Sequence, residues 1–122
     1  MIRAVVVLGA LACAAAIAAG AFGAHGLQGR LSVRSLELWE TAARYLVYGG
    51  LGTILAGLAA LHAGGRALPW AAAVLLAGAL LFAGTVFALA LGGPRWLGAV
   101  TPLGGTLMIL GFLLFAWGAL RL

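Results

Sequence analysis

The chain has 122 residues, a length that accommodates one domain. Hydrophobic residues make up 66% of the chain and charged residues 7%, whereas a soluble domain carries about 25% charged residues. Polar side chains are therefore too few to cover a water-soluble globule, and the composition predicts one membrane domain over residues 1–122. The single cysteine, Cys13, excludes a disulfide scaffold.

The formal net charge is +5, from seven arginines against Glu37 and Glu40. A basic chain is a candidate for nucleic-acid binding when its positive side chains gather on one polar surface. Here the arginines stand between long apolar runs, which is typical of anchors at the membrane interface. We therefore expect the chain to contact membrane lipids and not nucleic acid. The arginines are Arg3, Arg30, Arg34, Arg44, Arg66, Arg95 and Arg121.

Four uncharged intervals between the arginines are each long enough for one membrane crossing, because about 20 apolar residues span a hydrocarbon core about 30 Å thick. Lipid offers no partner for free backbone groups, so each crossing has to be helical. The predicted spans are residues 4–24, 45–63, 69–91 and 97–119. The short connections between the later spans predict an all-α fold, an antiparallel bundle of four transmembrane helices.

The first interval has an alternative interpretation as a cleaved signal peptide, since Arg3 provides a short positive start. Its apolar stretch of about 20 residues is longer than the roughly 7–15 residues of a signal-peptide core. We therefore favour a retained first helix. Cys13 is then expected to be a small apolar packing residue within it.

Residues 33–44 have the pattern of an amphipathic helix, with polar residues at helical spacing on one side and apolar residues on the other. Ser32 is suited to cap its first turn. We predict a separate interfacial helix that lies along the membrane surface between the first two spans, with Trp39 and Tyr45 at headgroup depth. Its charged side is either solvated or a contact surface for lipid headgroups or a partner. The candidate contact residues are Arg34, Trp39, Glu40 and Arg44.

The chain contains 20 glycines. In soluble helices each would cost about 1 kcal/mol relative to alanine, but in membranes small residues let helix backbones approach closely. None of the glycines lies between a strand and a helix, so a phosphate-binding loop is not predicted. We interpret them as helix-packing residues.

Titratable residues are nearly absent from the predicted spans. We place no Asp, Glu, Lys or Arg at mid-membrane depth, where a charge would mark an ion or proton path. His25 and His62 lie far apart in the sequence and the chain has one cysteine, so no metal-binding spacing occurs. There is no aspartate for a Ser-His-Asp set. We therefore predict no catalytic residues, no cofactor and no metal site.

Three further residues are candidates for functional or interface contacts, namely His25, Thr101 and Pro102. His25 stands in a glycine-rich stretch where backbone can pack closely around it, although an interfacial histidine is the simpler interpretation. Thr101 is expected to hydrogen-bond to its own helix or to a neighbouring one. Pro102 falls in the first turns of the fourth span, where it shapes the start of the helix without breaking it.

Several motifs, taken in order and spacing, resemble one family of membrane proteins. They are Gly20-Ala21-Phe22-Gly23-Ala24-His25-Gly26-Leu27, then Trp39-Glu40-Thr41-Ala42 and Arg44-Tyr45, then Leu81-Phe82-Ala83-Gly84, and finally Arg95-Trp96-Leu97-Gly98-Ala99-Val100-Thr101-Pro102-Leu103-Gly104-Gly105. The chain resembles the YgdD-like small bacterial inner-membrane proteins, the domain-of-unknown-function 423 family, and is distantly similar to transmembrane protein 256.

The resemblance implies a four-helix multi-pass protein of the bacterial inner membrane, and it implies no reaction. Members of the family often carry a histidine shortly after the Tyr-x-x-Tyr of the second span. This chain has Tyr45, Tyr48 and then Gly49. The difference weakens any histidine chemistry shared with His25 and favours a packing role.

We expect a small non-catalytic membrane protein that packs with lipids, with other membrane proteins, or with itself as a homo-oligomer. The alternative is a minimal carrier or channel for small solutes, dimeric because four thin helices enclose little space. A membrane-embedded enzyme is disfavoured, because the sequence lacks a set of nucleophile, base and acid.

Overall fold

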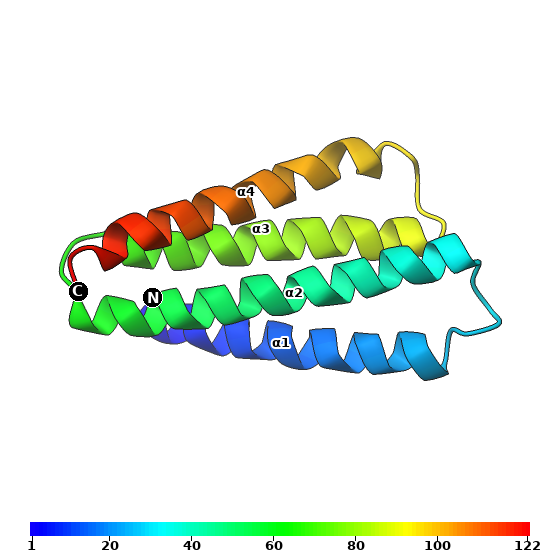
Figure 1. Cartoon of the computed structure of the whole chain (residues 1–122), viewed down its shortest axis with the longest axis horizontal. Coiled ribbons are helices and arrows are strands. Elements are labelled where there is room, and N and C mark those ends of the chain that lie inside the picture. The colour runs from blue at the N-terminus through cyan, green and yellow to red at the C-terminus, as the bar shows by residue number, and fades with distance from the viewer.

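The structure, a computed structural model, describes residues 1–122 and consists of four long helices joined by short connections (Figure 1). Each helix is long and apolar enough to cross a membrane. The predicted all-α, antiparallel arrangement of four apolar helices is therefore confirmed. The helices are α1 (Ile2–His25), α2 (Val33–Ala59), which the single 3-10 turn η1 (Ala60–His62) extends, α3 (Ala67–Ala90) and α4 (Leu97–Ala119).

The helices lie side by side in chain order, as Figure 1 shows. α1 packs mainly on α2, α2 on α3, and α3 on α4, while α1 makes only a minor contact with α3. The bundle is therefore an open layer in which α1 and α4 form the two edges. We call the end with the α1–α2 and α3–α4 connections (residues 26–32 and 91–96) the double-loop end. Both chain termini lie at the opposite end (Figure 1).

The predicted separate interfacial helix over residues 33–44 is wrong, because this segment is the first part of α2, which runs unbroken from Val33 to Ala59. Ser32 caps it as predicted, its hydroxyl accepting a hydrogen bond from the Ser35 N–H at 3.1 Å. No glycine or proline interrupts residues 33–48, so nothing stops the helix before the next span. Its apolar side also has a protein surface to cover, since Ala42 and Leu46 are buried in the core that α1 and α3 share. The apolar face of this segment therefore packs on neighbouring helices and does not lie on the membrane surface.

The core is built from small residues. One cluster holds Ala12, Ala16, Ala42, Leu46, Ala79, Ala83, Val86 and Met108, and a second holds Val5, Ala56, Ala71, Ala72 and Leu75. Large apolar side chains face outward instead; Ile17 of α1 is 68% exposed and Ile109 of α4 is 64% exposed. This distribution suits a bilayer, where lipid solvates leucine and isoleucine and close helix packing depends on small side chains.

α4 packs on α3 through three glycines spaced seven residues apart, Gly104, Gly111 and Gly118. A Cβ atom at Gly104 would lie 2.5 Å from the Phe82 nitrogen, one at Gly111 would lie 2.7 Å from Leu75 Cγ, and one at Gly118 would lie 2.9 Å from Leu68 Cγ. The three partners on α3 are also spaced by seven residues. We call these paired positions the heptad seam. At Gly111 and Gly118 a leucine side chain of α3 occupies the space that the glycine leaves, whereas at Gly104 the backbone of α4 closely approaches the backbone of Phe82.

Candidate functional site

Trp39 joins three helices near the double-loop end. Its indole N–H donates a hydrogen bond of 2.7 Å to the carbonyl oxygen of Ala19 on α1. Its ring meets Phe22 of α1 edge-on, with centroids 6.3 Å apart, and Phe87 of α3 edge-on at 4.6 Å. Gly23 makes room for the indole, because a Cβ there would lie 2.5 Å from Trp39 Cδ1. Trp39 is thus a bridge between three helices, and it belongs to α2 and not to a separate interfacial helix.

Thr85 of α3 and Thr101 of α4 form the only hydrogen bond between two side chains, with their hydroxyl oxygens 2.7 Å apart. Each hydroxyl also lies within hydrogen-bond distance of its own helix, Thr101 with the Leu97 carbonyl at 3.0 Å and Thr85 with the Leu81 carbonyl at 2.9 Å. Because each hydroxyl has one proton, one threonine donates across the interface and the other donates to its own helix. Both protons therefore have acceptors in either arrangement.

We expect Thr85→Val and Thr101→Val to be coupled in stability, since each removes one side of the same hydrogen bond. The double variant should lose less stability than the two single variants together, by about 0.6 kcal/mol and at most about 1.7 kcal/mol. The measurement is a double-mutant cycle of the free energy of unfolding in bicelles. Strictly additive losses would contradict the assigned bond.

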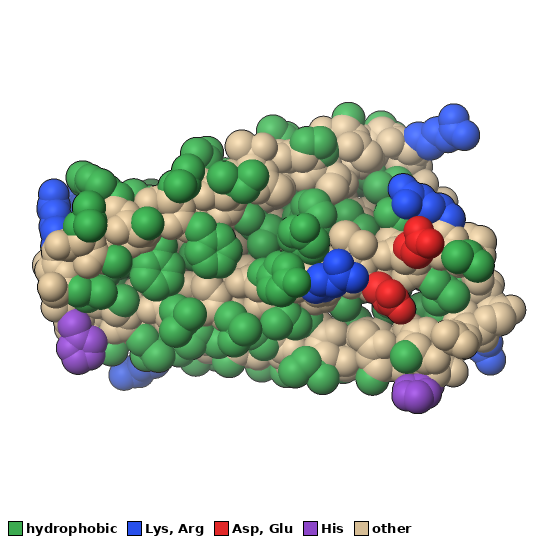
Figure 2. Space-filling model, viewed as in Figure 1, with side chains coloured by type: hydrophobic (Ala, Val, Ile, Leu, Met, Phe, Trp, Pro, Cys, Tyr) green, Lys and Arg blue, Asp and Glu red, His purple; other side chains and the backbone are tan.

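The outward face of α2 carries a polar stripe that continues into an apolar one. The exposed residues on this face follow one another at intervals of three or four positions. We call this set of residues the outer stripe. They are Glu37, Glu40, Arg44, Tyr48, Leu51, Leu55 and Leu58. Figure 2 shows both acidic side chains on one face, towards the double-loop end, with basic side chains near them and apolar side chains over the middle of the molecule.

α2 continues through Arg44 without a break, so Arg44 belongs to a helix that is long enough to cross a membrane. Val33–His62 has 30 residues, which measure about 45 Å along the axis at about 1.5 Å per residue. A hydrocarbon core about 30 Å thick, centred on this segment, starts about five residues from either end. Arg44 then lies about 9 Å inside the core and Glu40 about 3 Å inside it, by the same helical rise.

Arg44 has no ion-pair partner within the chain. The single ion pair joins Arg34 Nη1 to Glu37 Oε2 at 3.7 Å on the exposed first turns of α2. An arginine at the centre of a transmembrane helix costs about 2.5–3.5 kcal/mol, and a long side chain lowers this cost by extending towards the membrane surface. The direction of that extension leads Arg44 towards Glu40, one turn closer to the double-loop end.

A shallow groove of about 220 Å³ lies between α2 and α4, over α3, next to the outer stripe. Tyr45 and Tyr48 form one wall, and Gly105, Met108 and Phe112 belong to the other. The two tyrosine rings meet edge-on with centroids 5.3 Å apart, and Tyr45 also contacts the ring of Phe82 on α3 at 4.9 Å. The groove is apolar except for the tyrosine hydroxyls.

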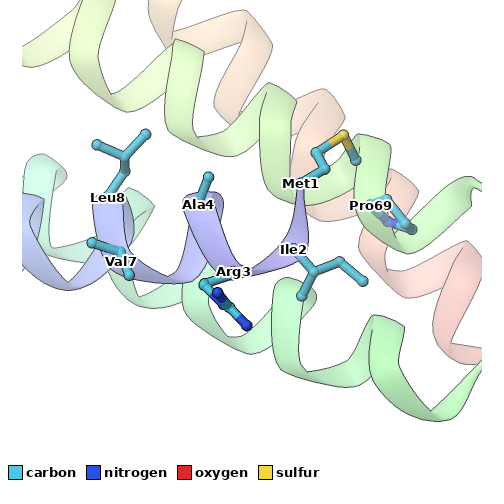
Figure 3. A pocket seen from close by; sticks show the side chains of 7 residues that line it. All are labelled: Met1, Ile2, Arg3, Ala4, Val7, Leu8 and Pro69. Carbon is cyan, nitrogen blue, oxygen red and sulfur yellow. The ribbon is translucent and has the colours of Figure 1, made fainter.

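The other candidate residues from the sequence analysis, His25 and Pro102, are not brought together with the residues described so far. His25 is exposed at the end of α1, and the two histidines lie at opposite ends of the molecule (Figure 2). Pro102 is exposed on α4, which continues through it. The largest hollow, about 980 Å³ and open, lies away from the double-loop end, where Met1, just before α1, lies near Pro69 of α3 (Figure 3). Apart from Arg3 its lining is aliphatic.

The sequence model of a protein of unknown function (DUF423) matches residues 19–105. The chain belongs to the DUF423 family. It is 41% identical over 116 residues to a UPF0382 membrane protein of Staphylococcus epidermidis, covering 95% of this chain and 94% of that one. It is also 35% identical over 117 residues to the UPF0382 membrane protein YwdK of Bacillus subtilis, covering 95% of each. No solved structure matches the chain. The predicted family and the bacterial membrane location are confirmed.

The motifs that carry the DUF423 resemblance meet one another in space at contacts between successive helices. Gly23 of the first motif packs on Trp39 of the second. Tyr45 contacts Phe82 of the third, and Phe82 packs against Gly104 of the last. The DUF423 motifs are therefore the contact points that join α1 to α2, α2 to α3, and α3 to α4.

Sequence reasoning missed three features of this DUF423 protein. Thr85 was not recognised as the partner of Thr101, and Phe87 was not recognised as a partner of Trp39; no local pattern signals either pair. The heptad seam did leave a signal, because Gly104, Gly111 and Gly118 share their spacing with Leu68, Leu75 and Phe82. Comparing glycine spacing in one span with large-residue spacing in the span before it would have found the seam.

Proposed function

We propose that this DUF423 protein is a non-catalytic membrane protein that acts by packing with lipids and other membrane proteins. The observation that carries the proposal is the inverted distribution of side-chain size. Small residues close the spaces between helices, and large apolar side chains cover the outside. A protein arranged in this way offers its surroundings an extensive apolar surface.

The tight interior supports the same proposal. α1 and α2 approach so closely that a Cβ at Gly50 would lie 2.7 Å from Cys13 Sγ and 3.0 Å from the Gly9 carbonyl oxygen. Thr53, fully buried in α2, donates its hydroxyl proton to the Gly49 carbonyl at 2.8 Å. Every buried polar side-chain atom has such a partner. The polar groups between the helices are thus engaged in holding the fold.

The open layer provides the surfaces for such packing. α4 contacts α3 almost alone, and α1 contacts mainly α2, so each edge helix leaves most of its circumference uncovered. In a bilayer these edges contact acyl chains or the helices of a partner, where shape and small residues decide affinity.

A second candidate function is a minimal dimeric carrier or channel for small solutes. The observation that favours it is the position of Arg44 and Glu40 on a helix long enough to span a membrane, because intramembrane charges line solute paths in transporters. In that arrangement the outer stripes of two copies would form the walls of the path.

Reconstitution of the purified chain in liposomes separates the two candidates. For a packing protein we expect the flux of protons, potassium, chloride and glycerol to equal that of protein-free liposomes, and native mass spectrometry from gentle extraction to show retained phospholipid. A flux well above that background, abolished by Arg44→Gln and retained in the control variant Leu8→Ala on α1, which lies outside the outer stripe, would replace the proposal with the carrier.

A further inference from the structure

We propose that a second copy of this chain docks on the outer stripe of α2, with Arg44 of each copy paired with Glu40 of the other. This inference rests on the proposed packing function and names one partner for it. Glu40 and Arg44 of the outer stripe are the only charged residues that α2 carries after Glu37.

The spacing of the outer stripe suits a helix–helix interface. Its residues recur every three or four positions over the length of α2, which is the spacing of a seam between two packed helices. The opposite side of α2 is already occupied, since Gly50 packs against α1 and Gly49 against Ala79 of α3. The outer stripe is therefore the one side of α2 on which a further helix can lie.

Charge complementarity indicates a second copy as the occupant. The stripe carries both signs, with Glu40 one helical turn nearer the membrane surface than Arg44. Two copies in one membrane with the same orientation are related by a two-fold axis along the membrane normal, so the same stripe meets itself. An arginine that extends towards the surface then reaches the height of the partner's carboxylate, about 6 Å along the axis. Symmetry repeats the pair, and both buried charges are neutralised.

An anionic lipid headgroup fits this stripe less well. A phosphate that approaches Arg44 from the membrane surface has to pass Glu40, which lies on the same face and repels it, whereas Glu37 is paired with Arg34. A pair between Glu40 and Arg44 of the same helix would neutralise the charge but leave both groups facing lipid, and the two side chains do not form one in this structure. A second copy both neutralises and covers them.

The first test uses disulfide crosslinking of the full chain in liposomes, in a Cys13→Ala background. Leu51 lies two turns below Arg44 on the outer stripe, so Leu51→Cys should crosslink to itself across the axis. Leu8→Cys is the matched control. Gly9 packs against Gly50, so Leu8 lies at the same depth as Leu51, and the two side chains are 48% and 49% exposed. Equal crosslinking of both variants would overturn the proposal.

The second test mixes two charge-reversed chains, each carrying Leu51→Cys. Arg44→Glu gives a chain with two negative charges at these positions, and Glu40→Arg gives one with two positive charges. Each alone should crosslink about tenfold less than the parent, because like charges then face each other. Co-reconstituted in equal amounts, they should recover the parent level as mixed dimers, since each pair between position 40 of one copy and position 44 of the other is again opposite in sign.

The mixing result identifies the occupant. A pair within one helix cannot produce recovery, because each charge-reversed chain carries like charges. If a lipid were the occupant, Glu40→Arg would retain more phosphatidylglycerol in native mass spectrometry and mixing would restore nothing, which would overturn the second-copy assignment. If a charge-reversed chain does not insert, the Leu51 and Leu8 comparison still decides. Crosslinking bears only on this inference, whereas solute flux bears only on the proposed packing function, so either can fail without the other.

Discussion

Replacing Gly104 with alanine is expected to destabilise the protein by about 3 kcal/mol, as overpacking of a close helix contact does. The new Cβ would lie 2.5 Å from the nitrogen and 2.8 Å from the Cα of Phe82. Because these are backbone atoms, no change of side-chain rotamer relieves the clash, and α4 has to move away from α3. The free energy of unfolding in bicelles, followed by circular dichroism during titration with sodium dodecyl sulfate, measures the loss.

Gly105→Ala is the matched control, since it adds the same methyl group one position along the same helix. A Cβ at Gly105 would meet only the edge of the Phe82 ring, at 3.6 Å, which is an ordinary van der Waals distance. Its unfolding free energy should stay within about 1 kcal/mol of the parent, the size of a glycine-to-alanine difference in helix propensity. If both variants lost the same stability, the heptad seam would not be what holds α4.

Trp39→Ala is expected to cost about 3–5 kcal/mol, the range for truncating a large aromatic side chain in a packed site. The variant loses the indole bond to the Ala19 carbonyl and the ring contacts with Phe22 and Phe87. The space opened beside Gly23 is bordered by three helices that are joined at this point, so it is poorly placed to collapse. Hydrogen exchange should accelerate in the last turns of α1, in addition to the loss in unfolding free energy.

Trp39→Phe separates packing from hydrogen bonding, because it keeps an aromatic ring and removes the N–H donor. It should lose only about 0.6–1.7 kcal/mol, the range measured for hydrogen bonds between membrane helices. A Trp39→Ala variant no less stable than Trp39→Phe would contradict the bridging role of the Trp39 ring.

The difference between prediction and structure at residues 33–44 has a physical cause. A polar face and an apolar face recur there at helical spacing, and both a surface helix and the exposed start of a transmembrane helix produce that pattern. The two cases differ in what covers the apolar face. Ala42 and Leu46 are covered by residues of α1 and α3 that are distant in the sequence. The local pattern therefore could not distinguish a surface helix from the start of a transmembrane helix.

Trp39 and Thr101 illustrate the same limit for the candidate site. Both are candidate residues in the sequence analysis, yet their partners, Phe87 and Thr85, lie on a different helix, α3. Arg44 was selected too, but its depth follows only from the continuity of α2. Choosing the residues required composition and motif order, whereas assigning their roles required the neighbours of each.

The amino-acid sequence by itself determined the membrane environment, the four helical spans, the capping by Ser32 and the DUF423 membership, because apolar length, helix signals and motif order are all local properties. Only the tertiary structure decided that the helices form an open layer, that Trp39 bridges three of them, and that Arg44 lies on an uncovered face of the continuous α2. These outcomes depend on which surfaces meet, and small side chains allow many pairs of helices to approach before close packing selects one.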